Sequence, residues 1–185
     1  MKGEIAMKVL VAYASKYGAT EGIALRIGET LSARGIEVDV RRCKELDEAS
    51  GYDAYVVGSA TYEFNWRKPA RKFVERNAEL LAARPTWLFS SGPLGTETVD
   101  KDGHDVLKDA APKQFAKYEE LVHPRGMQVF RGAYDHDKTR GGDRFVAWLP
   151  GLRDLMVEGD FREWDAIDAW ATSIADELQG GDARS

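Results

Sequence analysis

The sequence is short of cysteine, of excess basic charge and of long apolar runs. Cys43 is its only cysteine, which excludes an intrachain disulfide framework and a multi-cysteine metal site. The formal net charge is −5, whereas nucleic-acid phosphates need a basic face. No apolar run approaches the length of a membrane span, and the first residues lack the pattern of a signal peptide. We therefore expect a cytoplasmic protein with no transmembrane segment and no nucleic-acid partner.

Internal repeats and low-complexity linkers are also absent, so residues 1–185 are expected to form a single domain. Its expected core spans residues 7–178, and residues 179–185 are expected to be a frayed tail. Residues 1–6 are either a short extension or precede a true start at Met7, and the sequence does not decide between these.

Apolar runs alternate with helical periodicities along the chain. Nearly continuous apolar runs predict buried strands at Met7–Ala14, Ala54–Gly58, Thr86–Ser90 and Met127–Ala133, and strict alternation predicts an edge strand at Ile36–Val40. Helical spacing predicts helices over residues 20–34, 68–83 and 106–121, and a last helix that Asp160 caps, with Glu163 completing a capping box. This order predicts an α/β fold with a five-stranded parallel sheet in the order 2-1-3-4-5.

The stretch "YASKYGAT" (Tyr13 to Thr20) joins the first predicted strand to the first predicted helix. Unsatisfied N–H groups and the helix dipole favour an anion there, Ser15 and Thr20 add hydroxyl groups, and Gly18 allows a tight turn. The loop lacks the signatures of nucleoside-triphosphate and dinucleotide sites, so a phosphate monoester fits best. A plain serine- and glycine-containing turn that caps the helix is the alternative.

Two further predicted loops lie at carboxyl ends of strands, where α/β sheets bind ligands. "SATYEFNW" (Ser59 to Trp66) carries aromatic residues that either stack on a planar ring or pack against the next helix. "SSGPLG" (Ser90 to Gly95) is small and turn-forming, so its backbone can approach a ligand closely. A phosphate loop, an aromatic loop and a small-residue loop together describe a site for FMN.

These stretches, together with "YDAYVVGSATY", "FRGAYD" and "GDFREWDAIDAWA", resemble the flavodoxin-like superfamily. The similarity is greatest to the branch that contains menaquinone-dependent protoporphyrinogen oxidases and actinobacterial flavodoxin-domain proteins. It implies a flavodoxin-like three-layer sandwich that binds FMN. By this resemblance the FMN phosphate is bound by Ser15, Lys16, Tyr17, Gly18, Ala19 and Thr20. Ala60, Thr61 and Tyr62 border the isoalloxazine, while Ser91, Gly92, Pro93 and Leu94 contact its polar edge. No catalytic residue is assigned.

The long segment from Tyr134 to Gly159 combines arginines and large apolar residues with acidic ones. It either folds back over the sheet or provides, through residues 138–157, a peripheral membrane, quinone or substrate contact; a homodimer contact is another use. The scattered histidines, such as His104, have no histidine or cysteine at metal-ligand spacing, so no metal site is expected.

Three functions follow from these features. The first is an FMN protein for electron transfer or flavin-dependent reduction or oxidation, with a redox protein or a quinone as partner. The second is a menaquinone-dependent protoporphyrinogen oxidase (dehydrogenase) of heme biosynthesis, and the third is a flavin-free interaction domain. The acidic charge favours the first over the second, because it assists docking to protein partners.

Overall fold

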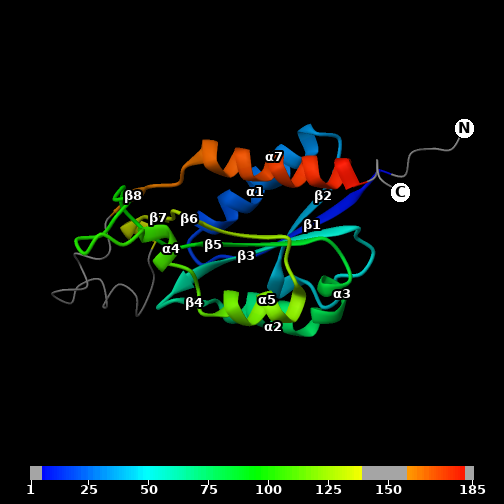
Figure 1. Ribbon diagram of the computed structural model, residues 1–185, viewed down its shortest axis with the longest axis horizontal. Helices are drawn as coiled ribbons and strands as arrows, with labels where there is room; N and C mark the ends of the chain where they lie inside the picture. Colours follow the sequence, from blue (N-terminus) through cyan, green and yellow to red (C-terminus); the bar gives the residue numbers. More distant parts are fainter. Residues whose placement is uncertain (1–5, 139–157, 182–185) are drawn as a thin grey trace, which may run out of the picture.

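A computed structural model describes residues 6–138 and 158–181. It is a three-layer sandwich in which α1 and α7 cover one face of a central sheet, and α2, α3 and α5 cover the other (Figure 1). The parallel strands are β1 (Lys8–Ala14), β2 (Glu37–Arg42), β3 (Ala54–Tyr62), β5 (Thr86–Ser91) and β6 (Gly126–Phe130). The helices are α1 (Ala19–Ala33), α2 (Lys68–Arg76), α3 (Ala78–Ala82), α4 (Val106–Asp109), α5 (Gln114–Val122) and α7 (Trp164–Gly181).

The sheet order is β2-β1-β3-β5-β6, which is the predicted order 2-1-3-4-5 when only the parallel strands are counted. The short strand β4 (Asn65–Trp66) pairs antiparallel with the end of β3 and was not predicted. A three-residue 3-10 turn, Cys43–Glu45, stands where a second crossover helix would be, as the missing helical pattern indicated. The edge position of β2 is also confirmed.

Alternate side chains of the strands fill two separate cores. Val9 and Val11 of β1 pack with Ile27 of α1 on one face. Leu10 and Ala12 of the same strand lie in the core on the other face. Because a strand buried on both faces can use apolar residues at every position, its sequence reads as a continuous run.

Several predicted boundaries are wrong. The predicted helix 68–83 breaks at Asn77, whose side chain donates to the Phe73 carbonyl at 2.9 Å. The predicted helix 106–121 is two helices, and the strand predicted at Met127–Ala133 ends at Phe130. None of the described helices is long and apolar enough to cross a membrane.

The start and the end of the last helix also differ from the prediction. Asp160 is not its N-cap: it pairs in β8 (Gly159–Asp160) with β7 (Ala133–Tyr134), and its carboxylate accepts from the Arg162 N–H. The helix begins after Glu163, whose carbonyl accepts from Ile167 at 3.1 Å. It continues to Gly181, so residues 179–181 are helical rather than part of a tail. The contacts predicted for residues 138–157 fall, apart from Lys138, outside the described residues.

Candidate functional site

Segments that follow three different strands meet at one edge of the sheet, at the end where β4, β7 and β8 lie (Figure 1). The buried Thr20 hydroxyl at the start of α1 hydrogen-bonds to the Ser91 hydroxyl at the end of β5 with an O–O distance of 2.8 Å. The Thr61 hydroxyl of β3 hydrogen-bonds to Ser90. A Cβ on Gly92 would lie 3.3 Å from the Thr61 Cβ. The structure thus brings residues 15–20, 60–62 and 91–94 together, and their contact with FMN stays a prediction.

The first turn has the geometry of an anion site. Gly18 has φ of +93°, its N–H donates to the Ser15 Oγ at 3.1 Å, and its carbonyl accepts the first helical bond from Gly22. The first N–H groups of a helix have no partner inside the helix, and α1 has 15 residues over which its dipole accumulates. The Ser15 oxygen acts as an acceptor in this turn, so its O–H remains a donor for a ligand.

A carboxylate in the same turn is neutralised by its neighbours. Glu21 accepts from the Tyr13 hydroxyl at 2.6 Å and forms a bidentate ion pair with Arg42 at 3.0 Å. These contacts hold the pKa of Glu21 below its ordinary value, with the Tyr13 hydrogen bond as the main cause. The pairing offsets the repulsion that Glu21 would exert on a phosphate at the start of α1.

A pocket of about 330 Å³ opens beside this turn. It lies between the first turn and the β7–β8 pair, and its lining includes Gly18, Ala19, Tyr134 and Arg162. The Tyr134 hydroxyl is buried and has no hydrogen-bond partner among the residues that the structure describes. Arg162 pairs with Asp160 and donates to the Ala19 carbonyl at 3.3 Å, which ties the β8 strand to the start of α1. The pocket thus lies at a helix N-terminus, and its lining combines the Arg162–Asp160 pair with the acidic residues Asp135 and Glu158.

The predicted aromatic loop is a β-hairpin rather than an open loop. Strand β3 continues to Tyr62 and turns back through Glu63 and Phe64, whose φ angles of 49° and 61° lie in the left-handed region. Tyr62 and Phe64 are 45% and 54% exposed, which leaves both rings available to a ligand or partner. Trp66 is buried, so packing against a following helix is the correct reading for this residue alone.

Side chains from α5 fix this hairpin in place. Gln114 accepts from the Trp66 N–H at 2.9 Å and donates to Asn65 at 3.0 Å. The N–H of Lys113 donates to the Phe64 carbonyl at 2.9 Å. Partial burial is the main cause of the raised pKa of Tyr62.

The third predicted loop begins two residues later than expected, since Ser90 and Ser91 belong to β5. Gly92, Pro93 and Leu94 follow the strand and are half-buried. The Gly92 N–H donates to the Phe130 carbonyl at 3.3 Å, and the Gly132 N–H donates to the Pro93 carbonyl at 2.9 Å. The loop is thus bound to the segment that follows β6.

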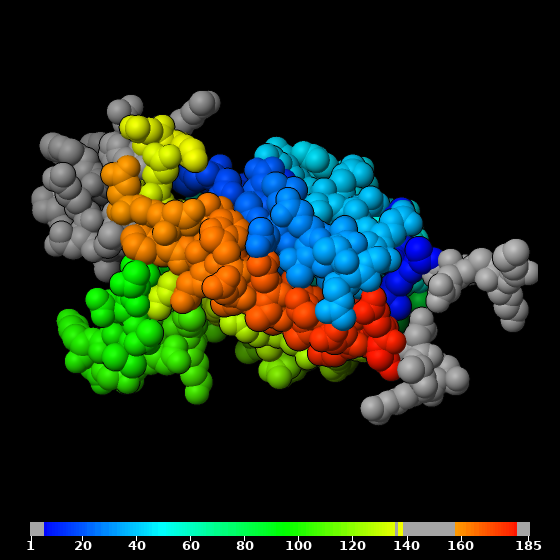
Figure 2. All heavy atoms as spheres, turned by 90° about the horizontal axis from the view of Figure 1, so that it is seen from above, coloured from blue at the N-terminus to red at the C-terminus, as the bar shows by residue number. Residues whose placement is uncertain are grey.

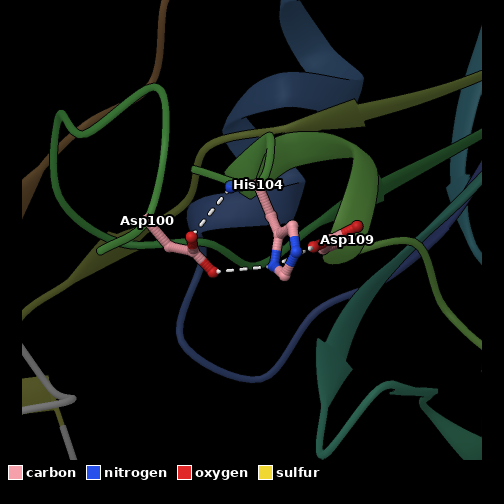
Figure 3. Close-up of side chains that lie close together, drawn as sticks. All are labelled: Asp100, His104 and Asp109. Atoms are coloured by element: carbon pink, nitrogen blue, oxygen red, sulfur yellow. Dashed lines mark hydrogen bonds and ion pairs between the residues drawn. The ribbon is translucent and has the colours of Figure 1, made fainter. Parts of the chain in front are cut away.

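Residues 99–105 form a loop that the sequence did not predict. The Asp100 carboxylate accepts from the His104 N–H at 2.9 Å, and the His104 Nδ1 lies 3.4 Å from Asp100 and 3.8 Å from Asp109. Figure 3 shows the three exposed side chains turned toward one another. The Val99–Asp105 bridge pairs the two ends of the loop. We assign these contacts to loop closure.

The single cysteine and the lysine of the first turn have different surroundings. Cys43 is fully buried, and burial raises the pKa of its thiol to about 12, so it is no nucleophile at neutral pH. Lys16 is exposed, and its ammonium lies 5.0 Å from the centre of the Tyr17 ring.

The flavodoxin-domain family model matches residues 10–150, well over half of the chain. The chain belongs to the flavodoxin-domain family. Family membership indicates FMN as the cofactor and identifies the chain as an FMN-type redox protein, as the sequence predicted.

Curated relatives include the protoporphyrinogen IX dehydrogenase [quinone] of Escherichia coli K12. It is 23% identical over 176 residues, which cover 91% of this chain and 95% of the relative. Among solved structures, oxidised Flavodoxin 2 from Bacillus cereus has a TM-score of 0.58 and 21% identity, with 92% of this chain and 99% of that chain covered. The rubredoxin:oxygen oxidoreductase of Desulfovibrio gigas has a TM-score of 0.59 and 18% identity. The match covers 94% of this chain but only 36% of that chain.

The described residues fit an FMN phosphate and ring in three respects. Nothing lies within 4 Å of the position of a Gly18 Cβ, so the turn is open to a ligand. The buried Tyr134 hydroxyl is unsatisfied among the described residues, and the Tyr62 and Phe64 rings are exposed at the same edge. Sequence reasoning missed the supporting residues Gln114 and Arg162, because their contacts are with residues distant in the sequence.

Proposed function

We propose that this protein is an FMN-dependent oxidoreductase that passes electrons between a reduced donor and a quinone or a redox protein. The observation that carries the proposal is the convergence of the first turn, the β3–β4 hairpin and the loop after β5 at one edge of the sheet. Bound FMN supplies one- and two-electron redox chemistry, for which the protein needs no acid–base pair of its own.

In this proposal, one group of residues binds the FMN phosphate and another contacts the flavin ring. The N–H groups at the start of α1, with the hydroxyls of Ser15 and Thr20, hold the phosphate in this proposal. Tyr62 and Phe64 contact the flavin ring and reduce the access of water to it. Apolar contact of this kind disfavours a negative charge on the ring and so lowers the potential of the step that creates it.

A protoporphyrinogen dehydrogenase that reduces a quinone is the second candidate. It is favoured by the match to the Escherichia coli dehydrogenase along 91% of this chain. Strands β7 and β8 also pair on either side of residues 139–157, and the described residues Lys138 and Glu158 line the pocket of the first turn. In this second function the segment provides the contact to substrate or quinone.

Anaerobic photoreduction of the purified, FMN-loaded protein separates the two candidates. A one-electron reduced flavin that accumulates and then transfers its electron to a small protein acceptor supports the carrier. Turnover of protoporphyrinogen with a menaquinone analogue, and no accumulation of the one-electron form, supports the dehydrogenase. A purified protein that takes up no FMN at micromolar concentration contradicts both.

The phosphate role of Thr20 is tested by comparing two ligands. Thr20→Val keeps the volume of the side chain and removes its hydroxyl, and we expect it to weaken FMN binding about tenfold, the effect of losing one charge-assisted hydrogen bond. Riboflavin, which lacks the phosphate, should bind with unchanged affinity. Thr30→Val removes a threonine hydroxyl of the same helix that lies outside the proposed site, and it is the matched control. An equal loss for FMN and riboflavin would show that Thr20 serves the packing of the site alone.

A further inference from the structure

Arg131 lies in the stretch "FRGAYD", directly after β6, and has no place in the function described above. Only 4% of its surface is exposed, although it carries a charge. Its guanidinium donates to the Gly95 carbonyl at 2.8 Å and to the Glu97 carbonyl at 2.6 Å. Its Nε lies 3.4 Å from the Glu163 carboxylate at the start of α7.

These contacts connect segments that are far apart in the sequence. Figure 2 shows the loop after β5 (green), the segment after β6 (yellow) and the start of α7 (orange) gathered at one end of the molecule. The backbone reinforces the same junction, because Gly92 donates to Phe130 and Gly132 donates to Pro93. On the other side, the Phe161 N–H donates to the Gly132 carbonyl at 3.1 Å. Arg131 therefore stands at the centre of a junction that holds the loop after β5.

A buried arginine is costly unless its donors are satisfied, and here the loop backbone satisfies them. The planar guanidinium presents its N–H groups as a rigid fork, which suits two carbonyls that are two residues apart. A lysine ammonium is a compact point charge without this fork. The loop conformation and the buried charge consequently depend on each other.

We propose that Arg131 is the positioning residue of the FMN site. It fixes the loop 92–97 against the flavin edge, and Glu163 couples this loop to the start of α7. The proposal rests on the proposed contact of residues 91–94 with the flavin ring. It predicts that the side chain acts through the loop backbone rather than through direct contact with the cofactor.

Three substitutions test this proposal in order of severity. Arg131→Met removes the charge and all its donors, Arg131→Lys keeps the charge without the fork, and Glu163→Gln removes only the ion pair. The matched control is Arg76→Met, because Arg76 also donates to a backbone carbonyl, that of Leu46 at 3.2 Å, on the α2 side of the sheet. Ile174→Ala, in the core between α7 and the sheet, controls for a general loss of stability.

Hydrogen exchange of the cofactor-free protein is the first measurement. We expect Arg131→Met to speed exchange of the hydrogen-bonded amides at this junction, those of Gly92, Gly132 and Val106, at least tenfold while the amides of β1 and β3 keep the rates of the wild type. Arg131→Lys should show an intermediate effect, Glu163→Gln a small one and Arg76→Met none in this loop. Exchange that rises equally in all strands would overturn the proposal in favour of a general structural role.

The second measurement is FMN affinity together with the midpoint potential. We expect Arg131→Met to bind oxidised FMN about tenfold more weakly. We also expect the two-electron potential to shift by about 30 mV. A shift of this size means that the substitution weakens the binding of oxidised FMN about ten times more than the binding of reduced FMN. Ile174→Ala should lower the thermal midpoint without moving the potential. A wild-type potential in Arg131→Met overturns the proposal.

The two proposals fail in different ways. If the wild type binds no FMN, the proposed function fails while the exchange result still reports on the junction. If the wild type binds FMN and Arg131→Met matches its affinity, potential and exchange, then only the role of Arg131 is refuted.

Discussion

Gly18 and Gly180 both have open space where a Cβ would stand, but their backbones differ. Gly18 has φ of +93°, which side chains rarely adopt, whereas Gly180 lies within α7. We expect Gly18→Ala to lower the free energy of unfolding by about 1 kcal/mol and to weaken FMN binding, because the turn must relax. Gly180→Ala should raise the free energy of unfolding by about 0.5 kcal/mol, since alanine favours a helix. Urea unfolding of the cofactor-free proteins measures both, and changes of the same sign would contradict the argument.

The hydrogen bond from Tyr13 to Glu21 predicts a pH-dependent stability. The bond lowers the pKa of Glu21 in the folded state, so its contribution is present above the unfolded pKa of about 4.3 and is lost as pH falls through the folded pKa. Tyr13→Phe should therefore reduce the free energy of unfolding by about 1 kcal/mol at pH 7 and by much less at pH 3. Denaturant unfolding across this pH range measures the difference.

The control for this prediction is the same substitution in a Glu21→Gln background. With no carboxylate to titrate, the effect of Tyr13→Phe should no longer depend on pH between 3 and 7. If Tyr13→Phe, in the protein that keeps Glu21, lowers the free energy of unfolding by the same amount at pH 3 and pH 7, then the hydrogen bond does not favour the charged form of Glu21.

The β3–β4 hairpin combines an unfavourable turn with exposed aromatic rings. Both central residues, Glu63 and Phe64, have positive φ, the geometry of a type I′ turn that Asn–Gly adopts most readily. A non-glycine residue held in the left-handed backbone region lowers the stability of the fold by about 1 kcal/mol or more, and such residues often lie at functional sites. The strain is therefore consistent with a turn that was kept for its Phe64 ring rather than for stability.

A double substitution tests this reading of the hairpin. Glu63→Asn with Phe64→Gly should raise the free energy of unfolding by about 1 kcal/mol because both residues then suit the turn. FMN affinity should fall, since the exposed Phe64 ring is lost. Glu63→Asn alone is the control: it should stabilise slightly and leave FMN affinity unchanged. If the double variant binds FMN as tightly as the wild type, Phe64 has no contact with the cofactor.

The elements that the sequence predicted well are those with a local physical signal. The continuous apolar runs of β1, β3 and β5 and the helical stripe of α1 required no knowledge of distant residues. The hairpin at Glu63–Phe64 was missed because its residues are not typical of a tight turn, and its support comes from Gln114, which bonds to Trp66 across 48 positions. Asp160 and Glu163 matched a capping box, yet the pairing of β8 with β7 prevails over this local preference.

The same distinction applies to the candidate site. The residues of "YASKYGAT" could be proposed from their place between a strand and a helix, and the structure brings them to the ends of β3 and β5. The link between Thr20 and Ser91 spans 71 positions, and Arg131 reaches 36 positions back to Gly95. No periodicity encodes such contacts, so the supporting residues emerge only from the folded molecule.

The β7–β8 pair brings together the described residues on either side of residues 139–157. Ala133 pairs with Asp160 and Tyr134 with Gly159, so the chain leaves the sandwich and returns to it at neighbouring points. All five parallel strands and both covering layers lie outside residues 139–157. A deletion of residues 139–157 can therefore test the cofactor part and the acceptor part of the proposed function separately.

Replacing residues 139–157 with a short Gly–Ser linker should leave a protein that folds cooperatively and keeps its FMN affinity within about threefold, since no described FMN-site residue is removed. Electron transfer to ferricyanide, which needs no specific site, should also be unchanged. Quinone reduction should fall at least tenfold if the segment provides the acceptor contact, because binding energy for the acceptor is lost while the flavin is not. Unchanged quinone reduction would assign the acceptor site to the sandwich itself, and loss of FMN would show that the segment completes the cofactor site.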